Sequence, residues 1–260
     1  MREIKEPKDR IIFPLDVSSV VEAQKWVAML KPHVGMFKVG LELQTTMLAD
    51  IISQERPENV VGRALNIWAL FSSSGLNNNV FWDGKFHDIP RTMVGAARAA
   101  AKLPIAMFNI HASAYKKAIR KAVANKGDKK VLGVTVLTSL EAEDCVSVFG
   151  KEPDLKVEQF ANFLFQEGAD GIICSPQETA YLRTCLKRMQ NMLIVTPGIR
   201  PDWAQKNDQK RVMTPGEAIR AGADYLVIGE PISNPPAKIG TPVDAAKKIA
   251  DEIAEALMEG

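Results

Sequence analysis

The feature of this sequence that most constrains its fold is an alternation of short apolar runs with longer amphipathic segments. The runs are rich in Ile, Val and Phe, as buried strands are, and the segments between them have helical periodicity. This pattern is typical of a parallel sheet covered by helices. The strands it predicts are 11–15, 34–39, 80–82, 105–110, 131–136, 171–174, 192–195 and 225–228.

The segments between these strands predict the helices. They are 20–30, 92–102, 157–166, 178–189 and 215–221, and a last helix, 242–258, ends the chain without a ninth strand. Eight strands alternating with helices favour an α/β fold of the closed (β/α)₈ TIM-barrel type, with an open doubly wound sheet as the competitor. Because no Pro- or Ser-rich linker interrupts the pattern, residues 1–260 are expected to form a single domain.

The segment 53–79 fits this scheme least well. It joins two predicted strands with more residues than one helix and its turns need. We therefore expect an insertion there, with an extra helix at 61–71 and a Ser-, Gly- and Asn-rich loop after it.

The charge balance and the N-terminus exclude several classes of partner. Thirty-three Lys and Arg against 31 Asp and Glu leave a net charge of +2, too even for a protein that holds nucleic acid by its overall field. The charged start, MREIKEPKDR, precedes only a short apolar run, so no export signal and no membrane contact are expected. Any anion-binding site must therefore be local.

The cysteines and histidines are too sparse for a metal site. Cys145, Cys174 and Cys185 are odd in number and show no CxxC spacing, which favours reduced packing residues in a cytoplasmic protein. The three histidines are too scattered to form a helical metal pair. We expect no metal and no organic cofactor.

Polar residues follow nearly every predicted strand. The active site of a barrel lies at the carboxyl ends of its strands. One charge there is commonly a solvated loop residue or a helix cap, but polar residues at seven successive strand ends favour an active site. These residues are Asp16, Lys38, Asp83, Lys85, Asn109, His111, Thr138, Ser139, Ser175 and Arg200.

The densest polar cluster is DGKFHDIPRT, residues 83–92. Strand alternation directs Asp83 and Lys85 to the same side, at the predicted barrel mouth. A lysine among carboxylates keeps its proton and becomes a positioned acid. A carboxylate beside an anionic substrate favours a reaction that discharges it.

This cluster resembles the DxKxxDIPxT signature of the orotidine 5′-monophosphate decarboxylase family, whose members release carbon dioxide to form UMP. The resemblance covers about residues 12–232, and the matching blocks follow the family's order. Besides residues 83–92 they are FPLDVS (13–18), FKVG (37–40), NIHAS (109–113), GVTVLTS (133–139), GADGIICSPQE (168–178), TPGIRP (196–201) and DQKRVMTPGEAI (208–219).

The resemblance implies a cofactor-independent decarboxylase acting on a nucleotide monophosphate. Lys38, Asp83, Lys85 and Asp88 would form an alternating charge chain, with Lys85 as the proton donor. Asp88 and Thr92 would reach into the neighbouring subunit's site, which implies a homodimer with shared active sites.

The resemblance also implies the contacts to the rest of the substrate. Asp16, together with Lys38, would contact the ribose hydroxyls, and Thr138 would contact the pyrimidine. Arg200, Gln209 and Gly229 would surround the phosphate, a role that suits a planar guanidinium and backbone donors.

Glu230 departs from the family's pattern. In this chain residues 227–232 are VIGEPI. The family has GRPI at this place, with an arginine that binds the phosphate, so Glu230 reverses the charge at that position. Either another cation occupies the position, with Lys206, Lys210 and Lys238 as candidates, or phosphate recognition is impaired.

Two other functions stay open. Related hexulose- and gulonate-phosphate enzymes, a phosphosugar decarboxylase and aldolase group, share the DxKxxD pattern and usually need magnesium. A protein impaired by Glu230 could instead be a binding or regulatory protein. The TPGIRP and LTS motifs favour the decarboxylase, and the intact like-charge cluster disfavours a non-catalytic protein.

Overall fold

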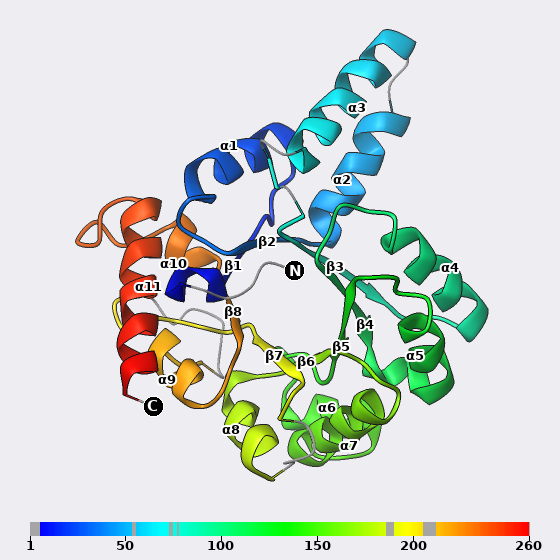
Figure 1. The fold of residues 1–260 in the computed structure, drawn as a ribbon, viewed down its shortest axis with the longest axis vertical. Helices are drawn as coiled ribbons and strands as arrows, with labels where there is room; N and C mark the ends of the chain where they lie inside the picture. Colours follow the sequence, from blue (N-terminus) through cyan, green and yellow to red (C-terminus); the bar gives the residue numbers. More distant parts are fainter. Residues whose placement is uncertain are drawn as a thin grey trace.

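The computed structural model describes residues 6–53, 56–72, 75–76, 78–185, 190–204 and 212–259. Eight parallel strands close into a barrel in sequence order, and β8 pairs with β1 (Figure 1). This closure confirms the TIM-barrel prediction and rules out the open sheet. The strands are β1 Ile11–Pro14, β2 Met36–Val39, β3 Val80–Phe86, β4 Met107–His111, β5 Lys130–Val134, β6 Gly171–Ile173, β7 Leu193–Thr196 and β8 Tyr225–Val227.

Helices surround the barrel (Figure 1). They are α1 Val20–Leu30, α2 Leu41–Ile52, α3 Pro57–Phe71, α4 Pro90–Ala100, α5 Tyr115–Val123, α6 Ala142–Phe149, α7 Pro153–Gln166, α8 Pro176–Cys185, α9 Pro215–Arg220, α10 Glu230–Ser233 and α11 Pro242–Met258, with 3₁₀ turns η1 Pro7–Arg10 and η2 Ala112–Ala114. The predicted helices are present, and α1 and α11 have the predicted bounds. Residues 186–189 of the helix predicted at 178–189 lie outside the described residues. Among the described residues, no helix is long and apolar enough to cross a membrane.

Several helices begin earlier than predicted because proline starts them. The first helical turn tolerates proline, whose missing N–H needs no partner there. Pro90, Pro153 and Pro176 thus open α4, α7 and α8 two to four residues before their apolar stripes become evident. In α9 and α11 the start is further fixed by capping boxes, Thr214 with Glu217 in α9 and Thr241 with Asp244 in α11.

Alternation along the strands determines what fills the barrel. One face of each strand packs outward against the helices, and the other packs into a small inner core. The polar positions two residues beyond the inner-core residues of β2, β3 and β4 therefore also point inward, at the carboxyl end. The inner-core residues are Met36, Phe81 and Met107, and the polar residues beyond them are Lys38, Asp83 and Asn109.

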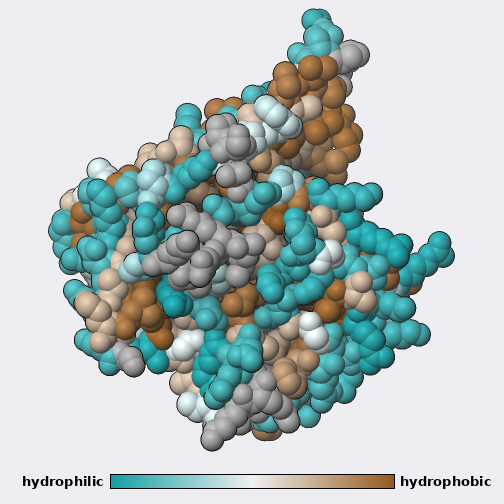
Figure 2. Space-filling model, viewed as in Figure 1, coloured by the Kyte–Doolittle hydropathy of each residue, from teal (hydrophilic) through white to brown (hydrophobic). Residues whose placement is uncertain are grey.

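The predicted insertion, residues 53–79, contains the second helix of a hairpin formed by α2 and α3. The helix expected at 61–71 is α3, which begins at Pro57 and packs against α2. The hairpin extends away from the barrel (Figure 1), and much of its surface is apolar (Figure 2). Its exposed apolar side chains include Leu48, Ile52, Val61, Leu65 and Trp68.

Candidate active site

A bulge in β3 shapes the centre of the site. Trp82 pairs with Phe108 and Phe86 pairs with Ile110, so three residues, 83–85, lie opposite the single residue Asn109. Lys85 adopts a left-handed backbone conformation with φ of 47°. Bulges of this kind redirect side chains next to active sites. Here the bulge turns the Lys85 side chain back toward Asp83.

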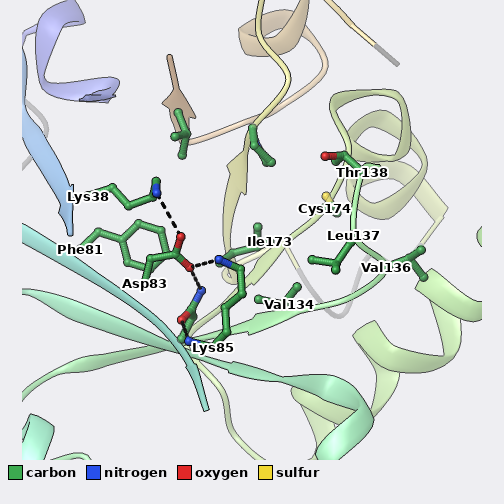
Figure 3. Close-up of a pocket in the computed structure, with 13 residues that line it drawn as sticks. Lys38, Phe81, Asp83, Lys85, Val134, Val136, Leu137, Thr138, Ile173 and Cys174 are labelled. Atoms are coloured by element: carbon green, nitrogen blue, oxygen red, sulfur yellow. Dashed lines mark hydrogen bonds and ion pairs between the residues drawn. The ribbon is translucent and has the colours of Figure 1, made fainter. Parts of the chain in front are cut away.

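Three of the four predicted charge-chain residues lie together (Figure 3). Asp83 Oδ1 accepts a hydrogen bond from Lys85 Nζ at 2.8 Å, and Asp83 Oδ2 lies 3.2 Å from Lys38 Nζ. Lys38 Nζ also donates to Asp16 Oδ1 at 2.9 Å. Asp16 and Lys38, which are both expected to contact the ribose, therefore lie side by side.

The cluster keeps Asp83 ionised. Burial alone would raise the pKa of Asp83, but the Lys38 and Lys85 ammonium groups and hydrogen bonds from Lys85 and Asn109 outweigh burial and lower it. Asp83 is thus a fixed negative charge at neutral pH, with two ammonium groups beside it.

This lowered pKa predicts a pH-dependent contribution to stability. A carboxyl group with a lowered folded pKa stabilises the fold above its unfolded pKa of about 3.9, and the contribution is lost as the pH falls through the folded pKa. We expect the unfolding free energy of the wild type minus that of Asp83→Asn to be constant from pH 7 to 5 and to decrease below pH 4. Denaturant unfolding at each pH measures this difference, and a difference that grows with acid would contradict the assignment.

A cavity of about 200 Å³ lies over the cluster. Lys38, Asp83, Lys85, Asn109 and Thr138 form its polar lining, and the remaining lining residues are apolar, among them residues of β5 and β6. Thr138, which is expected to contact the pyrimidine, is part of the cavity wall. A cavity with a few convergent polar groups and apolar walls suits a flat organic ring.

A second cavity, of about 250 Å³, continues the cleft toward β7 and β8. Lys38, Pro197 and Val227 line both cavities. Asp16, Arg200 and Gly229, which are expected to contact ribose and phosphate, line this second cavity together with Glu230. The cleft thus runs from the lysine cluster to the Arg200 guanidinium.

Glu230 is paired within this cleft. Its Oε2 lies 2.8 Å from Arg200 Nη2, and the Arg200 side chain is 10% exposed while that of Glu230 is 43% exposed. Among the described residues Glu230 pairs with Arg200, the expected phosphate ligand, and Lys238, one of the lysines suggested as an alternative cation, is exposed. Gln209, Lys206 and Lys210 lie outside the described residues.

Asp88 and Thr92 are not brought to the cluster within this chain. Both are exposed at the start of α4, and Asp88 Oδ1 accepts a hydrogen bond from the Ile89 amide at 2.6 Å. Among the described residues, no ion pair joins Asp88 to Lys85. The predicted fourth member of the charge chain is thus solvent-exposed at the rim.

Asn109 is the residue whose part the sequence did not reveal. It was noted only as a polar strand end, but it is 1% exposed and contacts both Asp83 and Lys85. The sequence signal that could have revealed this role was the inward register of Asn109, two residues after Met107.

In the described part of the chain, no three His, Cys, Asp or Glu side chains are grouped closely enough to hold a metal ion.

The fold and the site together define a TIM barrel that carries lysines paired with carboxylates at the carboxyl ends of its strands. Residues 9–249 match the model of the family described as Orotidine 5′-phosphate decarboxylase / HUMPS family, and the chain belongs to this family.

Individual relatives agree along nearly the whole chain. The orotidine 5′-phosphate decarboxylase of Syntrophotalea carbinolica is 39% identical, over 98% of this chain and 99% of that protein. The enzyme of that name from Anaeromyxobacter dehalogenans is 40% identical, over 94% and 98%. The crystal structure of orotidine 5′-phosphate decarboxylase from Lactobacillus acidophilus aligns with a TM-score of 0.67 at 27% identity, covering 94% of this chain and 98% of that one.

Proposed function

We propose that this chain decarboxylates orotidine 5′-phosphate to UMP without a metal or organic cofactor, as a step of pyrimidine biosynthesis. The observation that carries the proposal is the Lys38–Asp83–Lys85 cluster, centred on the buried Asp83 carboxylate, at the floor of a ring-sized cavity. The names of the full-length relatives support the same substrate. The cytoplasmic location expected from the cysteine pattern remains a prediction.

In this proposal the substrate lies along the cleft, with its ring in the first cavity and its phosphate in the second. The pyrimidine lies in the first cavity beside Thr138, with its carboxylate toward Asp83. The ribose hydroxyls reach the Asp16–Lys38 pair, and the phosphate points toward Arg200. This arrangement puts the reacting carbon next to the lysine that has to protonate it.

The reaction then needs only one bond cleavage and one proton transfer. The Asp83 charge disfavours the bound carboxylate beside it, while Lys38 and Lys85 favour the electron pair that develops on the ring carbon. The bond between the ring and the carboxylate breaks, carbon dioxide leaves, and the pair takes a proton from Lys85 Nζ. Lys85, now a neutral amine, regains a proton from water.

The test is to incubate the protein with orotidine 5′-phosphate in excess chelator and follow the pyrimidine absorbance. We expect turnover at the same rate with and without chelator. Complete inhibition by chelator, or no turnover at any substrate concentration, would refute the proposal.

A second function is suggested by the Arg200–Glu230 ion pair. Because Glu230 neutralises the guanidinium nearest the expected phosphate, this alternative is a protein that binds the nucleotide too weakly for efficient turnover.

The family description also includes HUMPS enzymes, so hexulose phosphate with magnesium is the control substrate for a phosphosugar enzyme. Turnover of the phosphosugar alone would favour that alternative.

The functional unit we propose is a homodimer. Asp88 and Thr92 are exposed at the rim, and the exposed apolar residues Leu41 and Ile89 follow the adjacent strands β2 and β3. A second copy covering this rim would bring Asp88 to the partner's cluster.

Complementation between inactive variants tests this dimer. Mixing Lys85→Ala with Asp88→Ala protein is expected to restore activity, because each mixed dimer then contains one site with both residues intact. Mass spectrometry of differently labelled subunits verifies exchange. Exchange without recovered activity would place Asp88 in its own subunit's site or outside catalysis.

A further inference from the structure

Asn109 occupies an unusual position in the barrel wall. It lies on β4 opposite the β3 bulge, where regular pairing of the two strands is interrupted, and it is 1% exposed. Its Oδ1 accepts a hydrogen bond from the Lys85 backbone N–H at 2.7 Å. Its Nδ2 donates to Asp83 Oδ1 at 2.6 Å.

These two bonds compensate for what the bulge removes. Bulged residues lose their ladder partners, and a buried backbone N–H without a partner is costly. Lys85 also adopts the left-handed conformation, which is unfavourable for a side chain with a Cβ. The Asn109 carbonyl oxygen gives the Lys85 N–H an acceptor in this conformation, so it stabilises the bulge at the residue that carries the acid.

Only a side-chain amide of this length supplies both contacts. It accepts with its oxygen and donates with its nitrogen, whereas an ionised carboxylate only accepts and would repel Asp83. Asp83 Oδ1 thus receives two donors, Asn109 Nδ2 and Lys85 Nζ. The amide therefore fixes the Lys85 backbone and the Asp83 carboxylate relative to each other.

We propose that Asn109 is a positioning residue for the proton donor Lys85, acting through the Lys85 backbone and the Asp83 carboxylate. The part of the inference that concerns catalysis rests on the proposed decarboxylase function. Asn109 lines the first cavity but not the second, to which we assign the ribose and the phosphate, and its amide is already bonded to Lys85 and Asp83. Its loss should therefore affect the chemical step much more than substrate binding.

The experiment compares Asn109→Leu, which keeps the volume but neither hydrogen bond, with the matched control Thr135→Val. Thr135, the residue after β5, is also buried. Its hydroxyl donates a hydrogen bond to the Ile173 carbonyl at 3.0 Å, away from the cluster. We expect Asn109→Leu to lower kcat by about 100-fold, the effect of a displacement near 1 Å, with KM within about threefold of the wild type. Thr135→Val should leave both constants within about threefold at a comparable loss of Tm. A kcat loss no greater than that of the control, or a rise in KM alone, would overturn the proposal.

Amide hydrogen exchange gives a readout that does not need turnover. We expect the Lys85 amide to lose protection in Asn109→Leu, while the Phe108 amide on β4 stays protected. Unchanged protection at Lys85 would overturn the positioning role.

If Asn109→Leu does not fold, Asn109→Ser is measured in the same way, because the short serine hydroxyl is too small to span both contacts. A wild type without decarboxylase activity would remove the proposed function, and the exchange result would still decide whether Asn109 holds the Lys85 backbone.

Discussion

Replacing Lys85 with Ala is expected to lower kcat by more than the 10²–10⁴-fold that is roughly usual for one general acid. The substitution removes the proton donor. It also removes one of the two ammonium groups that compensate the buried Asp83 charge. Leaving a buried charge with fewer partners is costly, so the pocket is expected to rearrange or to take up water.

Single-turnover kinetics of Lys85→Ala with saturating substrate measure this loss. The exposed Lys25 on α1 gives a matched control, Lys25→Ala, which removes the same side chain far from the cleft. We expect Lys25→Ala to retain wild-type kcat. A Lys85→Ala variant that kept a tenth of wild-type activity would rule out Lys85 as the proton donor.

Replacing Glu230 with Arg is expected to raise kcat/KM by an order of magnitude or more. In the structure Glu230 holds the Arg200 guanidinium, so an incoming phosphate must displace a carboxylate that repels it. A charge-assisted contact contributes about 1.5–3 kcal/mol, and every 1.4 kcal/mol is about tenfold. Binding energy at this remote end can also serve to orient the substrate, so kcat as well as KM can improve.

Glu230→Gln separates the effect of releasing Arg200 from the effect of adding a second cation. The amide has the same shape, and it releases Arg200 without adding a new cation, so its kcat/KM should fall between those of the wild type and Glu230→Arg. Raised ionic strength should help the wild type relative to Glu230→Arg, because salt screens a repulsion in one and an attraction in the other. If Glu230→Arg leaves kcat/KM unchanged or lowers it, another cation already holds the phosphate.

The strand pattern predicted the barrel and much of the site because both follow from local periodicity. Eight apolar runs predicted the eight strands, and strand alternation predicted that Asp83 and Lys85 share the barrel mouth. Helices α2, α5, α6 and α10 were not predicted. The shortest of them offer few periodic positions: α6 buries only Cys145, and α10 spans four residues.

Other features depend on contacts between distant segments. The β3 bulge and the two hydrogen bonds of Asn109 depend on the register between β3 and β4. The sequence of neither strand shows this register by itself. Likewise the sequence showed that Glu230 reverses a charge but not that Arg200, 30 residues earlier, is its partner. The role expected for Asp88 involves a second subunit, so it stays a prediction.

The central claim is that Lys85 protonates the ring carbon in a metal-free decarboxylation. The most direct measurement is to run the reaction in D₂O with excess chelator and to analyse the product by NMR and mass spectrometry. Since the Lys85 ammonium exchanges with solvent, the account predicts UMP with one deuterium on the carbon that carried the carboxylate, and one carbon dioxide per UMP. It also predicts that Lys85→Ala forms essentially none of this product. Metal-dependent turnover, or undiminished formation of deuterated UMP by Lys85→Ala, would contradict the account.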